Sequence, residues 1–136
     1  MGWKLELGAI ERNTRFGVIY NETAADNGKV YAVRMSGVSA ELLKLNPGNP
    51  TDTEYRAKVE SGFYRIRTLT TGGWEVTDRK GVKYFFGISA NARVEDPSDT
   101  SRVFRWNLTR VEDRDGNYVV VTYTKAATQE LRTRLR

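Results

Sequence analysis

The sequence predicts an all-β, antiparallel fold built from β-hairpins, and three observations support this prediction. Apolar and polar residues alternate with a period of two in most segments, which is typical of strands that bury one face. These segments are rich in the aromatic and β-branched residues that suit a pleated, half-buried surface. Short turn-forming sequences separate them, so neighbouring strands can pair as hairpins and form a twisted or sandwich-like sheet.

The predicted strands recur through most of the chain. In order, they occupy residues 3–7, 31–35, 63–69, 74–78, 82–87, 104–108 and 118–124. Turn-forming residues lie at 26–28, 72–73 and 78–81, and the polar stretch 46–53 is a longer loop, because its two prolines cannot donate to a strand ladder. Two segments carry helix-favouring residues instead, 39–45 and the tail from 125 to 136, where Leu131 and Leu135 share the spacing of one helical face.

One turn sequence occurs twice. Both copies run from a tryptophan through alternating residues to Asp-Arg-x-Gly and then into an aromatic strand, first at Asp78–Gly81 and then at Asp113–Gly116, with Asn117 following the second. A type I turn favours Asp at its first position, and it favours Gly where a left-handed backbone rejoins the ladder. We therefore predict that these residues form the bends of two similar hairpins.

The second copy also raises the possibility of a calcium site. Asp113, Asp115 and Asn117 could supply three oxygen ligands, but calcium takes six to eight, usually with a glutamate closing the loop. The first copy has Lys80 where the second carboxylate would lie. The turn explains both copies, so we predict no metal site and no cofactor here.

The composition restricts the chemistry that the chain could perform. With 136 residues it has the size of one domain, so residues 1–136 are expected to form a single β-rich domain. It contains no cysteine and no histidine, which excludes thiol nucleophiles, cysteine-ligated metals and the usual general base. Carboxylates remain, and Glu95, Asp96 and Asp99 cluster, but their Pro/Ser/Asp-rich surroundings indicate a solvated loop. We predict that the chain is not an enzyme.

Charge and hydropathy indicate no nucleic-acid or membrane partner. The net charge of +5 is concentrated in residues 101–136, which hold 8 Lys/Arg against 4 Asp/Glu, while residues 1–100 hold 14 against 13. We interpret this basic end as the end of a cut chain and expect nucleic-acid binding to be unlikely. No apolar run approaches the roughly 20 residues that a membrane-spanning helix needs.

Aromatic residues on the apolar faces are the predicted core. Arginines lie on the opposite faces of the same strands, as an amphipathic layout requires, so packing is favoured over stacking on bases or sugars. The core aromatics we predict are Trp3, Trp74, Trp106, Tyr84 and Tyr123.

Four blocks, taken in order, give the sequence a specific resemblance. They are GWKLELGAIERNTRFG, EYRAKVESGFYRIR, WEVTDRKGVKYFFG and WNLTRVEDRDGNYVVVTY, and together they span about residues 2–124. The set resembles the β-rich region of the SpvB and Tc-toxin B-component family, a relative of the Rhs/YD-repeat proteins. The resemblance implies a segment of an Rhs/Tc-type β-shell, excised from a larger bacterial protein, with Asp113, Gly116, Asn117 and Tyr123 in architectural roles.

The resemblance also implies a function. In this family, walls of β-hairpins enclose a toxic C-terminal polypeptide, and the Glu-x-Glu motif of the separate ADP-ribosyltransferase domain is absent from this chain. We therefore expect a non-enzymatic structural module of a secreted or cell-surface insecticidal-toxin-complex-like protein, which helps to enclose or present a toxin or effector. Its partners would be the remainder of the same polypeptide or a toxin-complex subunit.

Two alternatives and one liability accompany this interpretation. A glycan- or surface-polymer-binding β module would leave at least one of the three tryptophans exposed in a groove. A nucleic-acid binder would depend on the basic end. An excised wall segment would expose open strand edges, which we expect near Trp3 to Ile10, and these could pair copies of the chain into an edge-strand homo-oligomer.

Overall fold

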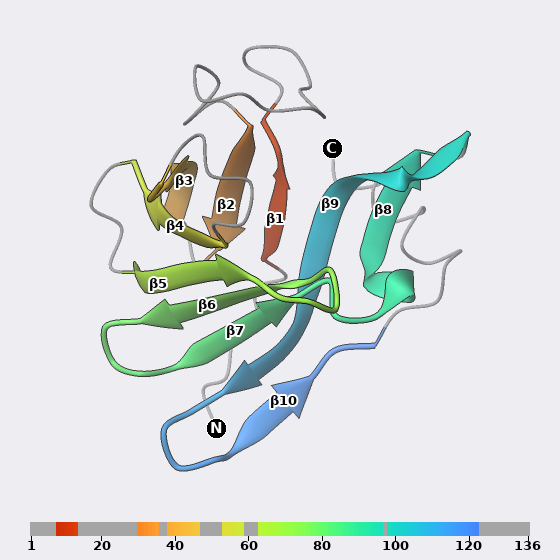
Figure 1. Cartoon of the computed structure of the whole chain (residues 1–136). Coiled ribbons are helices and arrows are strands. Elements are labelled where there is room, and N and C mark those ends of the chain that lie inside the picture. The colour runs from red at the N-terminus through yellow and green to blue at the C-terminus, as the bar shows by residue number, and fades with distance from the viewer. Residues whose placement is uncertain are drawn as a thin grey trace.

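The computed structural model describes residues 8–13, 30–35, 38–46, 53–58, 63–96 and 98–122. These residues form one antiparallel sheet of ten strands (Figure 1). The strands are β1 (Ala9–Arg12), β2 (Tyr31–Met35), β3 (Val38–Lys44), β4 (Glu54–Ala57), β5 (Phe63–Thr68), β6 (Trp74–Asp78), β7 (Lys83–Phe86), β8 (Arg93–Asp96), β9 (Asp99–Glu112) and β10 (Tyr118–Val120), and a short 3-10 helix, η2 (Ala90–Ala92), precedes β8. The predicted all-β antiparallel fold is confirmed.

The sheet closes on itself into a barrel. Strands β1 to β7 pair in sequence order, and β9 completes the ring because it pairs with β7 and also with β1. The pairs Ile10↔Trp106 and Tyr84↔Val111 show that β1 and β7 use different parts of this long strand. The closure is a feature that the alternating pattern alone did not predict.

Two strands lie outside the ring. Strand β8 pairs with the first half of β9, and β10 pairs with its second half, where Val119 lies opposite Val111. Figure 1 shows both flanking β9, with β8 beside the end near β1 and β10 beside the end near β7. Among the described residues, β8 and β10 each pair with β9 alone.

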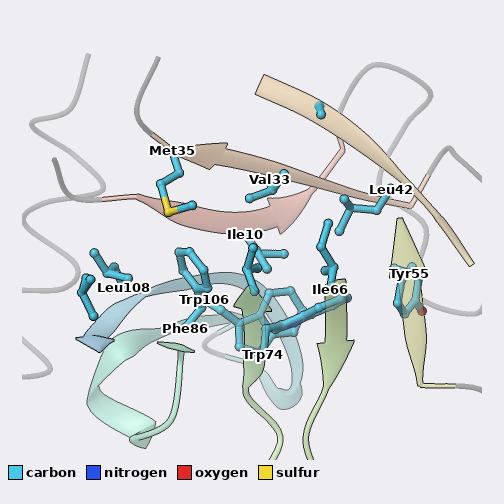
Figure 2. Close-up of a cluster of buried hydrophobic side chains, with 13 residues drawn as sticks. Ile10, Val33, Met35, Leu42, Tyr55, Ile66, Trp74, Phe86, Trp106 and Leu108 are labelled. Carbon is cyan, nitrogen blue, oxygen red and sulfur yellow. The ribbon is translucent and has the colours of Figure 1, made fainter. Parts of the chain in front are cut away.

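The core fills the inside of the barrel. Trp74, Phe86, Ile10 and Leu42 are the largest of its fully buried side chains, and Figure 2 shows them gathered with Trp106 between the strands. Edge-to-face aromatic pairs add about 0.5–1.5 kcal/mol each beyond simple burial. Such pairs join Trp74 to Trp106 at 5.8 Å between ring centroids, and Tyr31 to Trp74 at 5.0 Å. The two β strands that carry these tryptophans are therefore fixed together from within.

Strand pairing decides one segment that the sequence left open and corrects one expectation. The helix-favouring segment 39–45 forms most of β3, because β2 and β4 pair with this strand and Leu42 enters the core. The open edge expected near Trp3 to Ile10 is wrong for Ala9 and Ile10, since β2 and β9 flank β1 on both sides. Residues 1–7 and the tail from 123 to 136 lie outside the described residues.

The packing around Gly87 and the open space around Gly116 predict different costs for the same substitution. Both glycines have positive φ, +62° and +89°, so alanine at either should cost about 1–2 kcal/mol in backbone strain. A Cβ on Gly87 would also lie 2.8 Å from Trp106 Cβ, whereas a Cβ on Gly116 would meet nothing within 4 Å. We expect urea unfolding to show a loss for Gly87→Ala that exceeds that for Gly116→Ala by about 1–3 kcal/mol. Equal losses would contradict this packing of Trp106.

Candidate functional site

The carboxylates considered as candidate catalytic groups, Glu95, Asp96 and Asp99, lie at the bend between β8 and β9. Asp96 Oδ1 accepts hydrogen bonds from the Ser98 backbone N–H at 2.9 Å and from the Ser98 hydroxyl at 2.8 Å. These bonds, led by the one from the backbone, lower the pKa of Asp96 below its ordinary value. Asp99 forms an ion pair with Arg102 at 3.4 Å. A lowered pKa suits a turn carboxylate, whereas a general acid needs a raised one.

The first predicted turn joins β6 to β7. Asp78 Oδ1 accepts hydrogen bonds from the backbone N–H groups of Lys80 at 2.8 Å and Val82 at 3.0 Å, and Gly81 has a φ of +88°. The Tyr84 hydroxyl donates to Asp78 Oδ2 at 3.3 Å. Burial raises the pKa of Tyr84, and the charge of Asp78 and this hydrogen bond raise it further.

The second predicted turn, between β9 and β10, repeats this geometry. Asp113 Oδ1 accepts hydrogen bonds from the backbone N–H groups of Asp115 and Asn117, both at 2.9 Å. The Asn117 side-chain amide donates to Asp113 Oδ2 at 3.2 Å, and Gly116 has a φ of +89°. Both carboxylate oxygens of Asp113 thus accept bonds from its own turn. No group of three or more acidic, His or Cys side chains suited to a metal ion occurs among the described residues.

The predicted core aromatics that can be placed lie inside the barrel or against its core. Trp74 is 1% exposed and Trp106 is 6% exposed, while Tyr84 is half-buried. The Trp106 indole N–H donates to the Gly72 carbonyl at 3.1 Å. Neither tryptophan offers the exposed platform that a glycan-binding module would need. Trp3 and Tyr123 lie outside the described residues.

Two arginines that the sequence did not single out tie distant segments together. Arg12 is buried, donates from Nε to the Val103 carbonyl at 2.7 Å, and lies 5.3 Å from the centre of the Tyr31 ring. Arg93 donates to the carbonyls of Gly87 at 2.7 Å and Thr71 at 2.8 Å. Because guanidinium groups fan several donors in one plane, one side chain can satisfy carbonyls from two loops. A long-range contact of this kind leaves no local signal in the sequence.

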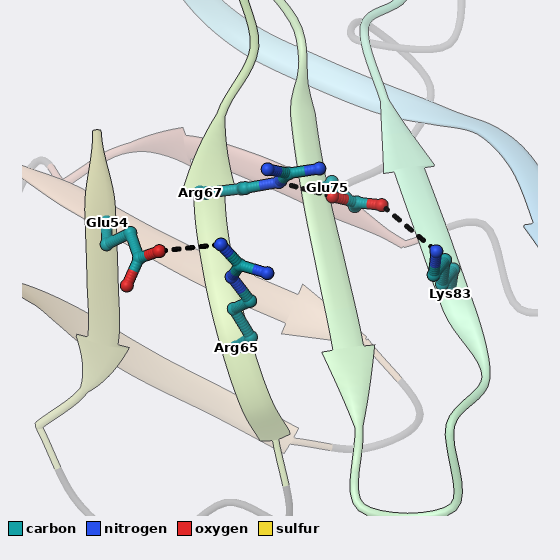
Figure 3. A network of polar contacts seen from close by, with 5 residues as sticks. All are labelled: Glu54, Arg65, Arg67, Glu75 and Lys83. Carbon is teal, nitrogen blue, oxygen red and sulfur yellow. Dashed lines mark hydrogen bonds and ion pairs between the residues drawn. The ribbon is translucent and has the colours of Figure 1, made fainter.

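The outer face of the barrel carries a polar network (Figure 3). Glu75 on β6 is buried, with 6% of its surface exposed. Its carboxylate forms ion pairs with Arg67 on β5 at 2.5 Å and with Lys83 on β7 at 3.9 Å. Arg65 pairs with Glu54 at 2.7 Å, but both side chains of this pair are substantially exposed. This part of the outward face, over β4 to β6, is therefore polar and internally neutralised, while the inward face is aromatic and apolar.

A groove of about 740 Å³ lies between η2 and the residues that follow β10, Val121 and Thr122. Its walls are mainly apolar, and its lining includes Leu69, Phe85, Ile88 and Val120. Arg110 also lines it, and the Arg110 Nε is a buried donor without a hydrogen-bond partner among the described residues. The arrangement can accept an apolar side chain or an apolar ligand, but it holds no acid and base pair for catalysis.

Fold and site together define a class, a closed antiparallel β module with an aromatic interior, whose described part contains no group of three or more acidic, His or Cys side chains suited to a metal ion. The family follows from a family model described as SpvB, Salmonella virulence plasmid 65kDa B protein, which matches residues 1–136. The chain belongs to this family, as the resemblance in its sequence predicted.

The curated relatives are much longer than this chain. The mono(ADP-ribosyl)transferase SpvB of Salmonella choleraesuis (strain SC-B67) is 25% identical over 140 residues, and the match covers 90% of this chain but 24% of the relative. The protein of the same name from Salmonella typhimurium matches with the same identity and coverage. The chain thus spans about a quarter of the length of the relatives it matches.

Solved structures share the fold. The N-terminal domain of the effector SpvB from Salmonella typhimurium strain LT2 has a TM-score of 0.57 and 21% identity, over 88% of this chain and 43% of that one. The TcdB2–TccC3–Cdc42 structure has a TM-score of 0.57 and 22% identity, over 88% of this chain and 6% of that one. The Tc holotoxin pore of Photorhabdus luminescens has a TM-score of 0.57 and 20% identity, over 100% of this chain and 7% of that one.

The Arg67–Glu75 pair predicts that replacing Arg67, an arginine on the outer face, lowers the free energy of unfolding strongly. Arg67→Met would leave the buried Glu75 carboxylate with Lys83 at 3.9 Å, so we expect a loss of about 1–3 kcal/mol in the free energy of unfolding. Arg65→Met on the same strand removes an exposed pair and should cost less than about 1 kcal/mol. Urea titrations of both variants measure the difference. The idea fails if the two losses are equal, or if adding Glu75→Met to Arg67→Met restores no stability.

The Asp113 turn predicts a pH dependence at the acid end. Desolvation opposes the charged form, but hydrogen bonds from Asn117, Asp115 and Gly116 outweigh it and lower the pKa of Asp113. The stability linked to this lowered pKa is present above the unfolded value of about 3.9 and is lost as the pH falls through the folded value. Between pH 5 and pH 2, the melting temperature of the wild type should therefore fall more than that of Asp113→Asn. Asp115→Asn, which retains the backbone donor to Asp113, should behave as the wild type does, and identical profiles for all three would refute the assignment.

Proposed function

We propose that this chain is a non-enzymatic structural module of a β-sheet wall in a secreted or surface protein of the SpvB, Rhs and Tc-toxin type. In this role it helps to enclose or present a toxin or effector, and its partners are the rest of the same polypeptide or a toxin-complex subunit. The observation that carries the proposal is the match of 88–100% of this chain to 6–7% of the much longer chains in two Tc-toxin structures. A unit that makes up so small a part of so long a chain has the character of a building element.

The distribution of side chains supports a mechanical role. The large aromatics point inward and fill the barrel, while ion pairs such as Arg67–Glu75 cover its outer face. The two Asp-x-x-Gly turns fix the hairpins through backbone hydrogen bonds, and we assign Asp78, Gly81, Asp113, Gly116 and Asn117 to this architectural task. The activity in the name of the Salmonella relatives belongs to proteins about four times the length of the matched region.

The proposal predicts that the complete reading frame continues as β-hairpin sequence and ends in a polypeptide that the wall protects from protease. Within that full-length protein, Trp106→Ala should loosen the barrel by about 3–5 kcal/mol and expose the C-terminal polypeptide to faster cleavage by a nonspecific protease. Leu45→Ala is the control, because Leu45 is already 46% exposed. The wall function is refuted if the C-terminal polypeptide is cleaved at the same rate in the wild type, Trp106→Ala and Leu45→Ala.

A further inference from the structure

Strand β10 presents an open backbone edge. The Asn117 carbonyl accepts from Asp113 N–H, and Val121 N–H donates to the Thr109 carbonyl, so both residues turn their backbone groups toward β9. Because backbone groups alternate between the two edges of a strand, Tyr118 and Val120 turn theirs away from β9. Within the described part of the chain, no strand covers that outer edge.

Among the described residues, the outer edges of β8 and β10 differ in how they are protected. Strand β8 has the sequence Arg-Val-Glu-Asp and is followed by Pro97, and charges and proline are the features by which proteins block edge pairing. The β10 edge carries no such protection. The run from Tyr118 to Thr122 contains no charge, no proline and no glycine, and three of its five residues are valine. Its composition favours the addition of a strand.

The side chains next to this edge leave it electrically neutral. Arg110 donates to Glu112 at 2.6 Å, and its guanidinium lies 4.2 Å from the centre of the Tyr118 ring. The nearest cation and anion on β9 therefore neutralise each other. Tyr118 and Val120 remain 59% and 53% exposed, so an apolar surface accompanies the open backbone.

We propose that the outer edge of β10 is a strand-docking surface and that its occupant is β10 of a second copy of this chain. Antiparallel pairing about a two-fold axis places Tyr118 opposite Val120 of the other copy and Val119 opposite its own counterpart. The outward backbone groups of Tyr118 and Val120 then exchange hydrogen bonds in two symmetrical pairs.

The occupant follows from the self-complementarity of the edge. The two-fold register matches an aromatic residue with a β-branched one, which is a favourable cross-strand pair, and it opposes no like charges along the edge. Arg110 lies opposite Val120 on the neighbouring strand, and in the dimer Val120 lies opposite Tyr118 of the other copy, which in turn lies opposite Glu112 of that copy. The cation of one copy and the anion of the other therefore lie in one cross-strand row. This inference stands on the chemistry of the edge and does not depend on the proposed function. The edge is short, so the dimer is expected to be weak and concentration-dependent.

The register is tested by a single introduced cysteine, since the chain has none of its own. Directly opposed residues of a non-hydrogen-bonded antiparallel pair have Cα atoms about 4.5 Å apart, which allows a disulfide. Val119→Cys occupies this position in the proposed dimer and should form a covalent dimer under mild oxidation with oxidised glutathione. Leu45→Cys, at an exposed aliphatic residue outside the edge, is the control. Crosslinking of Val119→Cys no faster than that of Leu45→Cys would overturn the proposal.

A second variant tests the edge without altering the pairing with β9. Val120→Pro removes the outward N–H, and proline is tolerated at an edge position whose N–H faces solvent. In sedimentation velocity over a concentration series, the wild type and Leu45→Lys should dimerise, and Val120→Pro should weaken the dimer by about tenfold or more. Near-UV circular dichroism confirms that the tryptophan environment is kept. A wild type that stays monomeric at millimolar concentration, or a dimer indifferent to Val120→Pro, would overturn the proposal, and the latter would assign the contact to another surface.

Discussion

The pairing of β9 with both β1 and β7 is the constraint on which the rest of the structure depends. Without the pair Ile10↔Trp106, strands β1 to β7 would form an open sheet with two edges and one apolar face exposed to water. Closure requires β9 to reach β7 on its other edge a few residues later, and the register shift between Phe85 and Phe86 lies at that place. A bulge bends a strand and increases its twist, which is what the transition from one side of the barrel to the other requires.

Closure in turn dictates what the interior must hold. An eight-stranded ring leaves a space that side chains can just fill, and here aromatic rings provide the volume. Trp74 and Trp106 meet at 5.8 Å between centroids, and Gly87 has no side chain at the place where Trp106 packs against the backbone. The buried guanidinium of Arg12 covers the aromatic cluster beside Tyr31 and Trp106, where an aliphatic residue would leave the Val103 carbonyl without this donor. The barrel, its rings and its tight glycine are parts of one packing solution.

Patterns within short stretches of sequence predicted the strands and the turns of this fold. The period of two in YAVRM and WEVTD identified strands, and repeated Asp-Arg-x-Gly located the bends where Asp78 and Asp113 accept backbone bonds. The closure of the barrel could not be predicted in this way, because a strand such as YAVRM shows the same alternation whether the sheet is closed or open. The segment 39–45 shows the opposite effect, where pairing on both edges overrides helix-favouring residues. Arg93 and the groove arise from loops distant in sequence, so no spacing could indicate them.

The strands that the barrel does not need are the ones most informative about its associations. The ring is complete with β1 to β7 and β9, so β10 adds nothing to closure, and none of its three residues is buried. A strand with one partner and exposed side chains contributes little to the stability of its own fold. Its neighbour β8 has the charges and proline that keep an edge solitary, whereas β10 has a neutral, β-branched edge. The fold thus places its protected edge on one side of β9 and its receptive edge on the other, so the proposed association uses the β10 edge alone and ends with a closed two-fold pair.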